Sequence, residues 1–202
     1  MNSDNSNSFV LQTIIFEGAL AIIGAFLALL CGLDLWKAFQ TNNGSELLCQ
    51  LGLGLAISAG MCLFFAILDL VPLKCLQDVS EKTKDIVCET FKNTTRFNRF
   101  LVCMQAGIGE EILFRGFIFI VIFEYWPWGL EFNLNIIAAI AISSILFGLG
   151  HCVTLLYFFI TGLMGVVFCL IFLWTGSLIA PVIAHGLYDF YAMEMALKEN
   201  DA

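Results

Sequence analysis

Long apolar stretches separated by short polar segments are the main feature of this sequence. A transmembrane helix needs about 20 predominantly apolar residues, and the stretches that qualify are residues 9–36, 47–73, 100–123, 134–152, 155–174 and 177–193. The pattern predicts an all-α fold, a polytopic transmembrane helix bundle of about six spans. Because the last three stretches are joined by very short connections, five or seven spans are the alternatives.

One long polar segment separates the second stretch from the third. Within residues 75–97, apolar side chains recur at loosely helical intervals among charged ones: Leu76, Val79, Ile86, Val87 and Phe91. The segment is interpreted either as a helix lying on the inner leaflet or as a solvated connecting loop.

The positive charges predict the orientation. Cytoplasmic loops carry an excess of Lys and Arg, and six of the nine such residues lie in or next to the polar segment: Lys74, Lys82, Lys84, Lys92, Arg96 and Arg99. The segment is therefore expected in the cytoplasm, with the N-terminus and, for six spans, the C-terminus on the same side. The tryptophans agree, because this topology places all four at outer ends, where aromatic belts form: Trp36, Trp126, Trp128 and Trp174.

Composition supports a membrane protein. Of the 202 residues, 60% are hydrophobic and 13% are charged, whereas a soluble domain averages about 45–50% and about 25%. The net charge of −8 offers no basic stripe for phosphates, which excludes nucleic acid as a partner. The eight cysteines fall mostly in apolar runs without CxxC spacing, so we interpret them as small packing residues. The first nine residues lack Lys and Arg, so the first span is expected to be retained rather than cleaved.

Three ionisable residues interrupt the third apolar stretch. A charged side chain inside a span costs roughly 2.5–3.5 kcal/mol on insertion scales, so Glu110, Glu111 and Arg115 require an explanation. Glu111 and Arg115 stand at i and i+4 with the acid first, the favoured order for an ion pair within one helix. That pairing leaves Glu110 as the free carboxylate. The alternative is that all three merely link helices.

Both histidines of the chain also belong to spans. His151 ends the fourth stretch, while His185 and Asp189 lie one turn apart in the sixth, so that Asp189 can orient the imidazole. Taken singly, each could serve packing. In the predicted topology, however, all three share the cytoplasmic half with Glu110, and one polar cavity open to the cytoplasm is expected. A carboxylate and two imidazoles there suit the activation of water and the stabilisation of an oxyanion.

The three motifs Glu110-Glu111-xxx-Arg115, Phe147-xxx-His151 and His185-xxx-Asp189 occur in that order on successive predicted helices. Together they resemble the CPBP (CAAX protease and bacteriocin-processing) intramembrane proteases, a family that includes the type II CAAX prenyl endopeptidases. The resemblance implies a protease core over residues 100–193, after two spans and the connecting segment in residues 1–99 and before a polar tail at 194–202.

The resemblance also implies roles for the motif residues. Glu110 would activate the attacking water, with His151 as its proton partner. His185 and the residue four later would stabilise the oxyanion, and Glu111 with Arg115 would form a supporting ion pair. The family motif often ends in Asn, whereas this chain has Asp189; an ionised Asp only accepts hydrogen bonds. Either Asp189 is protonated or it orients His185, and we favour the second interpretation.

No cofactor follows firmly from the sequence. If a metal is used, Zn²⁺ could be bound by Glu110, His151 and His185 with an open fourth position. No HExxH pair is present to fix two ligands on one helix face. A further acid, Glu17, lies within the first span on the side of the proposed site, either lining a substrate path or hydrogen-bonded within the bundle.

The leading functional prediction is an intramembrane endopeptidase that hydrolyses a peptide bond near the cytoplasmic face. Its partners would be the lipid bilayer and a membrane-associated peptide or protein substrate. It is expected to be an integral, multi-pass membrane protein, in the plasma or inner membrane if the source is bacterial. One alternative is a non-catalytic membrane immunity or scaffold protein of the same family. Another is a small transporter, which predicts inverted repeats, and none is found in the sequence.

Overall fold

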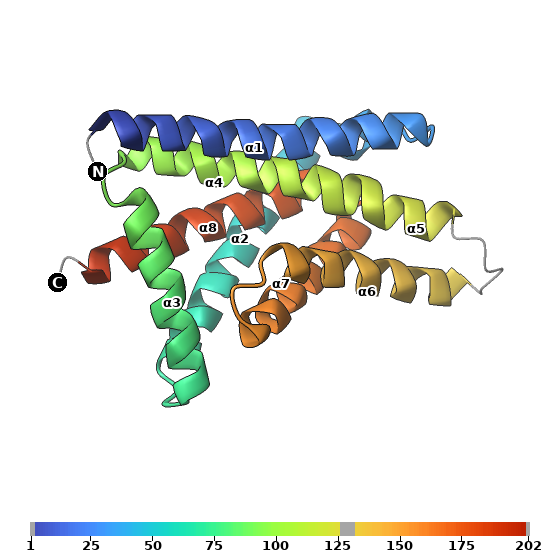
Figure 1. Cartoon of the computed structure of the whole chain (residues 1–202). Helices are drawn as coiled ribbons and strands as arrows, with labels where there is room; N and C mark the ends of the chain where they lie inside the picture. The colour runs from blue at the N-terminus through green and yellow to red at the C-terminus, as the bar shows by residue number, and fades with distance from the viewer. Residues whose placement is uncertain (1–2, 126–131, 201–202) are drawn as a thin grey trace.

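The fold is a bundle of helices (Figure 1). The computed structural model describes residues 3–125 and 132–200, where every regular element is helical, so the all-α prediction is confirmed. The elements are α1 (Ser3–Leu30), η1 (Leu35–Phe39), α2 (Gly44–Asp69), α3 (Lys74–Phe91), α4 (Arg96–Glu111), η2 (Ile112–Phe119), α5 (Ile120–Tyr125), α6 (Phe132–Gly150), α7 (Leu155–Thr175) and α8 (Ile179–Asn200).

The first predicted span is interrupted near its end. Helix α1 stops at Leu30, and Gly32 follows with a φ of 75°, a left-handed conformation that glycine adopts without steric cost. The side chain of Asp34 then accepts a hydrogen bond from the backbone N–H of Trp36, which begins the short 3₁₀ helix η1. The apolar pattern continues across this turn, which explains why the predicted span is too long.

The third predicted span is one continuous rod built from α4, η2 and α5 (Figure 1). Its middle part, η2, is π-helical and begins directly after Glu111. A π-helix changes the register of the backbone hydrogen bonds, and such segments are frequent at functional sites. Ser143 of α6 donates a hydrogen bond of 2.9 Å to the carbonyl of Phe114, so a neighbouring helix satisfies an acceptor within the π-helical segment.

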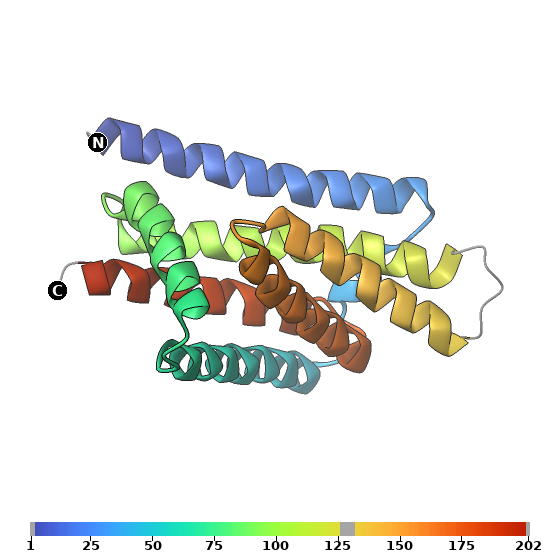
Figure 2. The ribbon, with the colours of Figure 1, turned by 60° about the horizontal axis from the view of Figure 1, so that its bottom comes forward.

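The polar segment after α2 is a helix, α3, at the end of the bundle where α1 begins and α8 ends (Figures 1 and 2). Phe91 of α3 meets Phe9 of α1 edge to face with ring centroids 5.7 Å apart. The Cys88 thiol donates to the carbonyl of Ala196 of α8 over 3.7 Å. Residues 194–200, expected as a polar tail, continue α8 as helix, and the α3 helix ties this end of the bundle together.

Glycine contacts set the spacing between α4 and α8. A Cβ added to Gly107 of α4 would lie 2.9 Å from the backbone nitrogen of Gly186 of α8 and 3.0 Å from the carbonyl oxygen of Val182. Such distances are far too short for a side chain, so the two backbones touch at this point. The contact lies next to Glu110 on one helix and His185 on the other, and it brings these two residues together.

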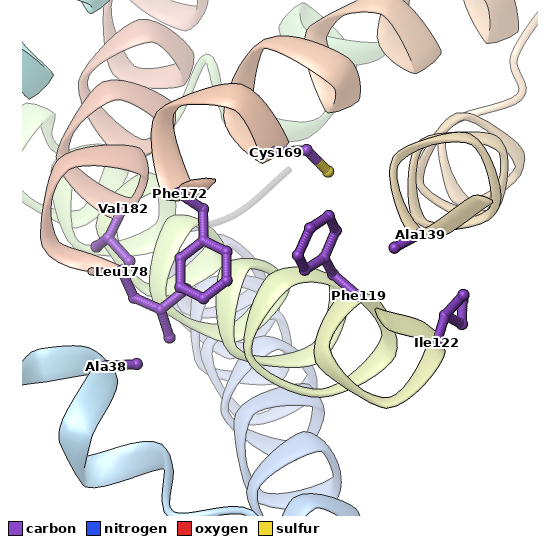
Figure 3. Packing of buried hydrophobic residues seen from close by; sticks show 8 residues of the cluster. All are labelled: Ala38, Phe119, Ile122, Ala139, Cys169, Phe172, Leu178 and Val182. Atoms are coloured by element: carbon purple, nitrogen blue, oxygen red, sulfur yellow. The ribbon is translucent and has the colours of Figure 1, made fainter. Parts of the chain in front are cut away.

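The main apolar cluster lies at the opposite end of the bundle from α3. Its buried members come from η1, η2, α5, α6, α7 and α8 (Figure 3): Ala38, Phe119, Ile122, Ala139, Cys169, Phe172, Leu178 and Val182. The backbone N–H of Leu178 donates to the carbonyl of Ala38 over 2.8 Å, which fastens η1 to the start of α8. This cluster packs η1, α6 and α7 against the rod formed by η2 and α5 and against the start of α8.

Much of the outer surface is apolar. Side chains such as Ile22, Leu48 and Leu155 are about 70% exposed, and many large exposed apolar side chains on long apolar helices are typical of contact with lipid. Three described helices are long and apolar enough to cross a membrane, namely α1 over Ser8–Leu30, α2 and α7, and α6 is a shorter apolar helix over Leu134–Gly150. Six spans and the orientation remain predictions. Trp36 and Trp174 are strongly exposed, whereas Trp126 and Trp128 lie outside the described residues.

Candidate active site

The ionisable residues of the three motifs come from separate elements and meet in one cluster. Glu110 and Glu111 end α4, Arg115 lies in η2, and His185 belongs to α8. Glu111 and Arg115 are fully buried, and His185 and Glu110 are buried as well. His151 directly follows α6, and its imidazole reaches the same cluster. The helices therefore assemble these side chains although the sequence separates them by up to 75 positions.

Glu111 is the centre of the buried part of the cluster. Its Oε1 atom accepts a hydrogen bond of 2.8 Å from the Arg115 guanidinium, so the structure contains the ion pair expected within this helix. The same oxygen lies 2.9 Å from Nδ1 of His185. The Arg115 Nη2 group in turn donates to the carbonyl of Gly165 of α7 over 3.0 Å. Glu111 and Arg115 thus link three parts of the bundle and fix one side of the His185 ring.

Aromatic rings enclose the buried guanidinium and the imidazole. The Arg115 Cζ atom lies 4.6 Å from the ring centroid of Phe147 and 5.1 Å from that of Phe168, within cation–π range. Phe168 also stacks on His185 with centroids 4.9 Å apart. The sequence signals Phe147 through its motif, but nothing in the sequence distinguishes Phe168 or Gly165 from other apolar residues of α7.

Glu110 faces both histidines. Its Oε2 atom lies 3.5 Å from Nε2 of His151 and 4.0 Å from Nε2 of His185, and it accepts no hydrogen bond within the protein. Nδ1 of His151 lies 2.9 Å from the carbonyl oxygen of Phe147; because a carbonyl only accepts, this nitrogen carries the donated proton. The arrangement therefore turns Nε2 of His151 toward the free carboxylate.

Asp189 completes the contacts of His185. Its Oδ2 atom lies 3.2 Å from Nε2 of His185, one helical turn away. The two ring nitrogens of His185 thus face Glu111 on one side and Asp189 on the other, so the plane of the ring is held from both sides. The side chains of Asp189 and His151 are 32% and 29% exposed, and these two residues form the accessible side of the cluster.

Glu17 approaches the site from α1. A Cβ on Gly109, the residue before Glu110, would collide with the backbone carbonyl of Glu17, so α1 and α4 touch at this point. The backbone of Glu17 is therefore in contact with the residue next to Glu110. The Oε2 atom of Glu17 is buried without a hydrogen-bond partner. The structure therefore adds a fourth side to the cluster that no motif of the sequence described.

The donors around Glu110 are not arranged as a set of metal ligands. Across residues 3–125 and 132–200, no group of three or more His, Cys, Asp or Glu side chains is placed to hold a metal ion. The reason is visible at His185, where one nitrogen contacts Glu111 and the other contacts Asp189.

Taken together, the helices and the cluster define a multi-pass membrane protein with a buried acid–histidine site. The family model of the type II CAAX prenyl endopeptidases, Rce1-like, matches residues 93–191. The chain therefore carries a domain of the Rce1-like type II CAAX prenyl endopeptidase family, and the resemblance predicted from the three motifs is confirmed. No curated protein and no solved structure matches the chain.

Proposed function

We propose that this protein is an intramembrane endopeptidase that uses a glutamate-activated water. The observation that carries the proposal is the position of Oε2 of Glu110, which is buried, accepts no hydrogen bond within the protein, and lies 3.5 Å from Nε2 of His151 and 4.0 Å from Nε2 of His185. A free carboxylate beside two imidazoles is suited to general base catalysis. Membership of a protease family supports this chemistry over a purely packing role for the same residues.

In the first step of the proposed reaction, Glu110 acts as the general base. A water bound between Glu110 and His151 transfers a proton to the Glu110 carboxylate, while its oxygen attacks the scissile carbonyl carbon. His151 is held by Phe147, so its Nε2 atom points at the same place. The breakdown of the tetrahedral intermediate breaks the C–N bond. The proton taken from water then passes to the leaving amine, which leaves a new carboxyl group on the other product.

The oxyanion of the tetrahedral intermediate is stabilised by His185. The negative charge that forms on the carbonyl oxygen needs a hydrogen-bond donor that is already in place. His185 fits this role because Glu111 and Asp189 fix its ring at both nitrogens. An N–H at Nε2 can exchange its contact with Asp189 for one with the oxyanion. Asp189 in this scheme orients His185 and does not itself donate.

The accessible side of the site and the distribution of basic residues favour cleavage near the cytoplasmic face. The accessible residues of the site are His151 and Asp189. Asp189 lies in α8, the helix that packs against α3, and the basic residues that predict a cytoplasmic location lie in α3 and in the segment from its end into the first turn of α4. The substrate is proposed to be a membrane-associated peptide or protein, and the protein to reside in the membrane with about six spans, in the plasma or inner membrane if the source is bacterial.

The test is cleavage of a panel of membrane-anchored reporter peptides by the purified protein and by Glu110→Ala. The panel includes prenylated C-terminal tails and unmodified peptides. Wild type is expected to cleave at least one reporter. The cleavage rate of Glu110→Ala is expected to be at least about a hundredfold lower, since general base catalysis contributes roughly 10²–10⁴-fold to the rate. Thermal unfolding in detergent checks that both proteins are folded. Equal cleavage by the two would contradict the assignment of the base.

Each preparation is also assayed with a zinc chelator. Activity that survives prolonged chelation agrees with a reaction carried by Glu110 and the histidines alone. Complete loss on chelation, with recovery when Zn²⁺ is returned, would instead assign Glu110, His151 and His185 as metal ligands. A folded wild-type protein that cleaves no reporter would favour the non-catalytic immunity or scaffold alternative.

A further inference from the structure

One acid beside the site has no part in the mechanism described above. Glu17 belongs to α1, outside residues 93–191 that match the family, yet the backbone of α1 at Glu17 lies directly against Gly109. Figure 1 shows α1 running alongside the rod of α4 and α5. The first helix thus places an acidic residue against the turn of α4 that carries Glu110, from a part of the chain that the family match does not cover.

The Glu17 carboxylate lacks a protein partner where one would be expected. Its Oε2 atom is buried and accepts no hydrogen bond, and leaving a buried acceptor unsatisfied costs about 1–3 kcal/mol. The basic group that acts on Glu17 is His185, and both of its ring nitrogens contact other acids, Glu111 and Asp189. An ionisable residue within a span whose buried oxygen has no hydrogen-bond partner is a candidate for contact with a ligand.

A peptide substrate needs such an acceptor. Hydrolysis requires the peptide to be extended at the scissile bond, which releases backbone N–H groups from their helical partners. In an apolar surrounding every released N–H must find another acceptor. Glu110 is reserved for water, Oε1 of Glu111 already contacts Arg115 and His185, and Asp189 contacts His185. Oε2 of Glu111 is also buried without a hydrogen-bond partner, but the Glu111 side chain is fully enclosed and its other oxygen holds Arg115 and His185. Glu17 is therefore the acid whose unpartnered oxygen serves neither the water nor the contacts that hold His185 and Arg115.

We therefore propose that Glu17 is a substrate-positioning residue that accepts a hydrogen bond from a backbone N–H beside the scissile peptide bond. The inference rests on the proposed protease function and extends the site to α1. The hydrogen bond would hold the peptide so that its carbonyl carbon faces the water bound at Glu110. At this position of the substrate, the enzyme would then require an unsubstituted backbone N–H and would not select among side chains.

The test combines substitutions of Glu17 with methylation of the substrate. A cleaved reporter is synthesised with single N-methyl groups at each backbone amide around the scissile bond. In wild type, one such methylation is expected to lower kcat/KM about tenfold or more, because it removes a hydrogen bond to a charged acceptor. In Glu17→Leu the same methylation should cost less than about threefold, whereas Glu17→Gln, which retains an acceptor, should show an intermediate effect.

The dependence of the methylation effect on Glu17 distinguishes a direct contact between Glu17 and the substrate from a role of Glu17 in helix packing. If Glu17 only packed α1 against α4, its replacement would lower activity equally for every methylated reporter. An identical methylation profile for wild type and Glu17→Leu therefore overturns the inference and leaves the protease function in place. Should Glu17→Leu fail to fold, the comparison between wild type and Glu17→Gln decides in the same way. Absence of cleavage by folded wild type overturns the protease function, and this inference with it.

Discussion

Arg115 is the residue whose position is hardest to maintain in an apolar bundle. Its guanidinium is fully buried, binds Glu111 and the carbonyl of Gly165, and lies over three aromatic rings. Burying such a pair is expensive, and removing one partner leaves an uncompensated charge that costs about 3–5 kcal/mol. The residue is therefore expected to hold the site together rather than to react.

The first prediction concerns this pair. Arg115→Met should lower the free energy of unfolding by about 3–5 kcal/mol, measured by denaturation in mild detergent. Arg96→Met is the control, because its side chain is 75% exposed and Glu194 remains bound to Arg99. An exposed pair of this kind contributes roughly 0–1 kcal/mol. Equal stability of Arg115→Met and wild type would contradict the structural role assigned to the guanidinium.

The second prediction concerns Asp189, which contacts Nε2 of His185 over 3.2 Å. Asp189→Asn should retain most of the cleavage activity, because the amide oxygen can still accept from the imidazole and the amide nitrogen can donate to an oxyanion. Asp189→Leu removes both possibilities and should lower kcat by about tenfold or more. The pair of variants is compared by steady-state kinetics. Full activity of Asp189→Leu would show that His185 needs no orienting partner here.

At the scale of elements, the contact between α4 and α8 determines whether the cluster can form. Gly107 has no room for a Cβ, since three backbone atoms of α8 lie within 3.2 Å of that position. Backbone atoms cannot move aside as a flexible side chain can, so a larger residue must separate the helices. Glu110 and His185 lie one turn or less from this contact and would move with it.

The third prediction follows from this contact. Gly107→Ala should destabilise the protein by about 1–3 kcal/mol, as overpacking does, and should lower activity because the distance between Glu110 and His185 increases. Gly60→Ala in α2 is the matched control, since nothing lies within 4 Å of its added Cβ. Alanine in a helix interior is favoured over glycine by about 1 kcal/mol, so the control should be as stable as wild type or more so. A fully active, stable Gly107→Ala would contradict the packing argument.

The sequence predicts the helices more completely than their contacts. Apolar runs and the i, i+4 spacing of Glu111 and Arg115 are local patterns, so both can be recognised along the chain itself. The contact between Glu111 and His185 joins residues 74 positions apart, and no local pattern encodes it. The π-helical register of η2 and the turn at Gly32 escape prediction for a similar reason, because hydrophobic residues continue through both.

At the scale of the whole molecule, the two ends of the bundle differ. One end contains α3, the beginning of α1 and the end of α8 (Figures 1 and 2), together with most of the positive charge. The other contains η1 and the apolar cluster of Figure 3. The location of Glu17 next to Gly109 also means that the first helix is part of the wall around the candidate site, although the sequence motifs lie only in the second half.

The fourth prediction tests the orientation with the protein's own cysteines. Cys75 is exposed in the first turn of α3, and Cys31 is exposed just after α1. Two variants are compared, one in which Cys31 is the single remaining cysteine and one in which Cys75 is. A membrane-impermeant maleimide should label Cys31 in intact cells and Cys75 only after permeabilisation. The reverse pattern would invert the topology and place the candidate active site toward the outer face.

The most direct test of the central claim is a double-mutant cycle on Glu110 and His151, assayed with a cleaved reporter. If the two residues activate one water together, Glu110→Gln should lose at least about a hundredfold in kcat/KM, and adding His151→Gln should lower it by no more than about threefold further. Independent losses that multiply would show that the two side chains act separately. Activity retained by folded Glu110→Gln would contradict the proposed mechanism altogether.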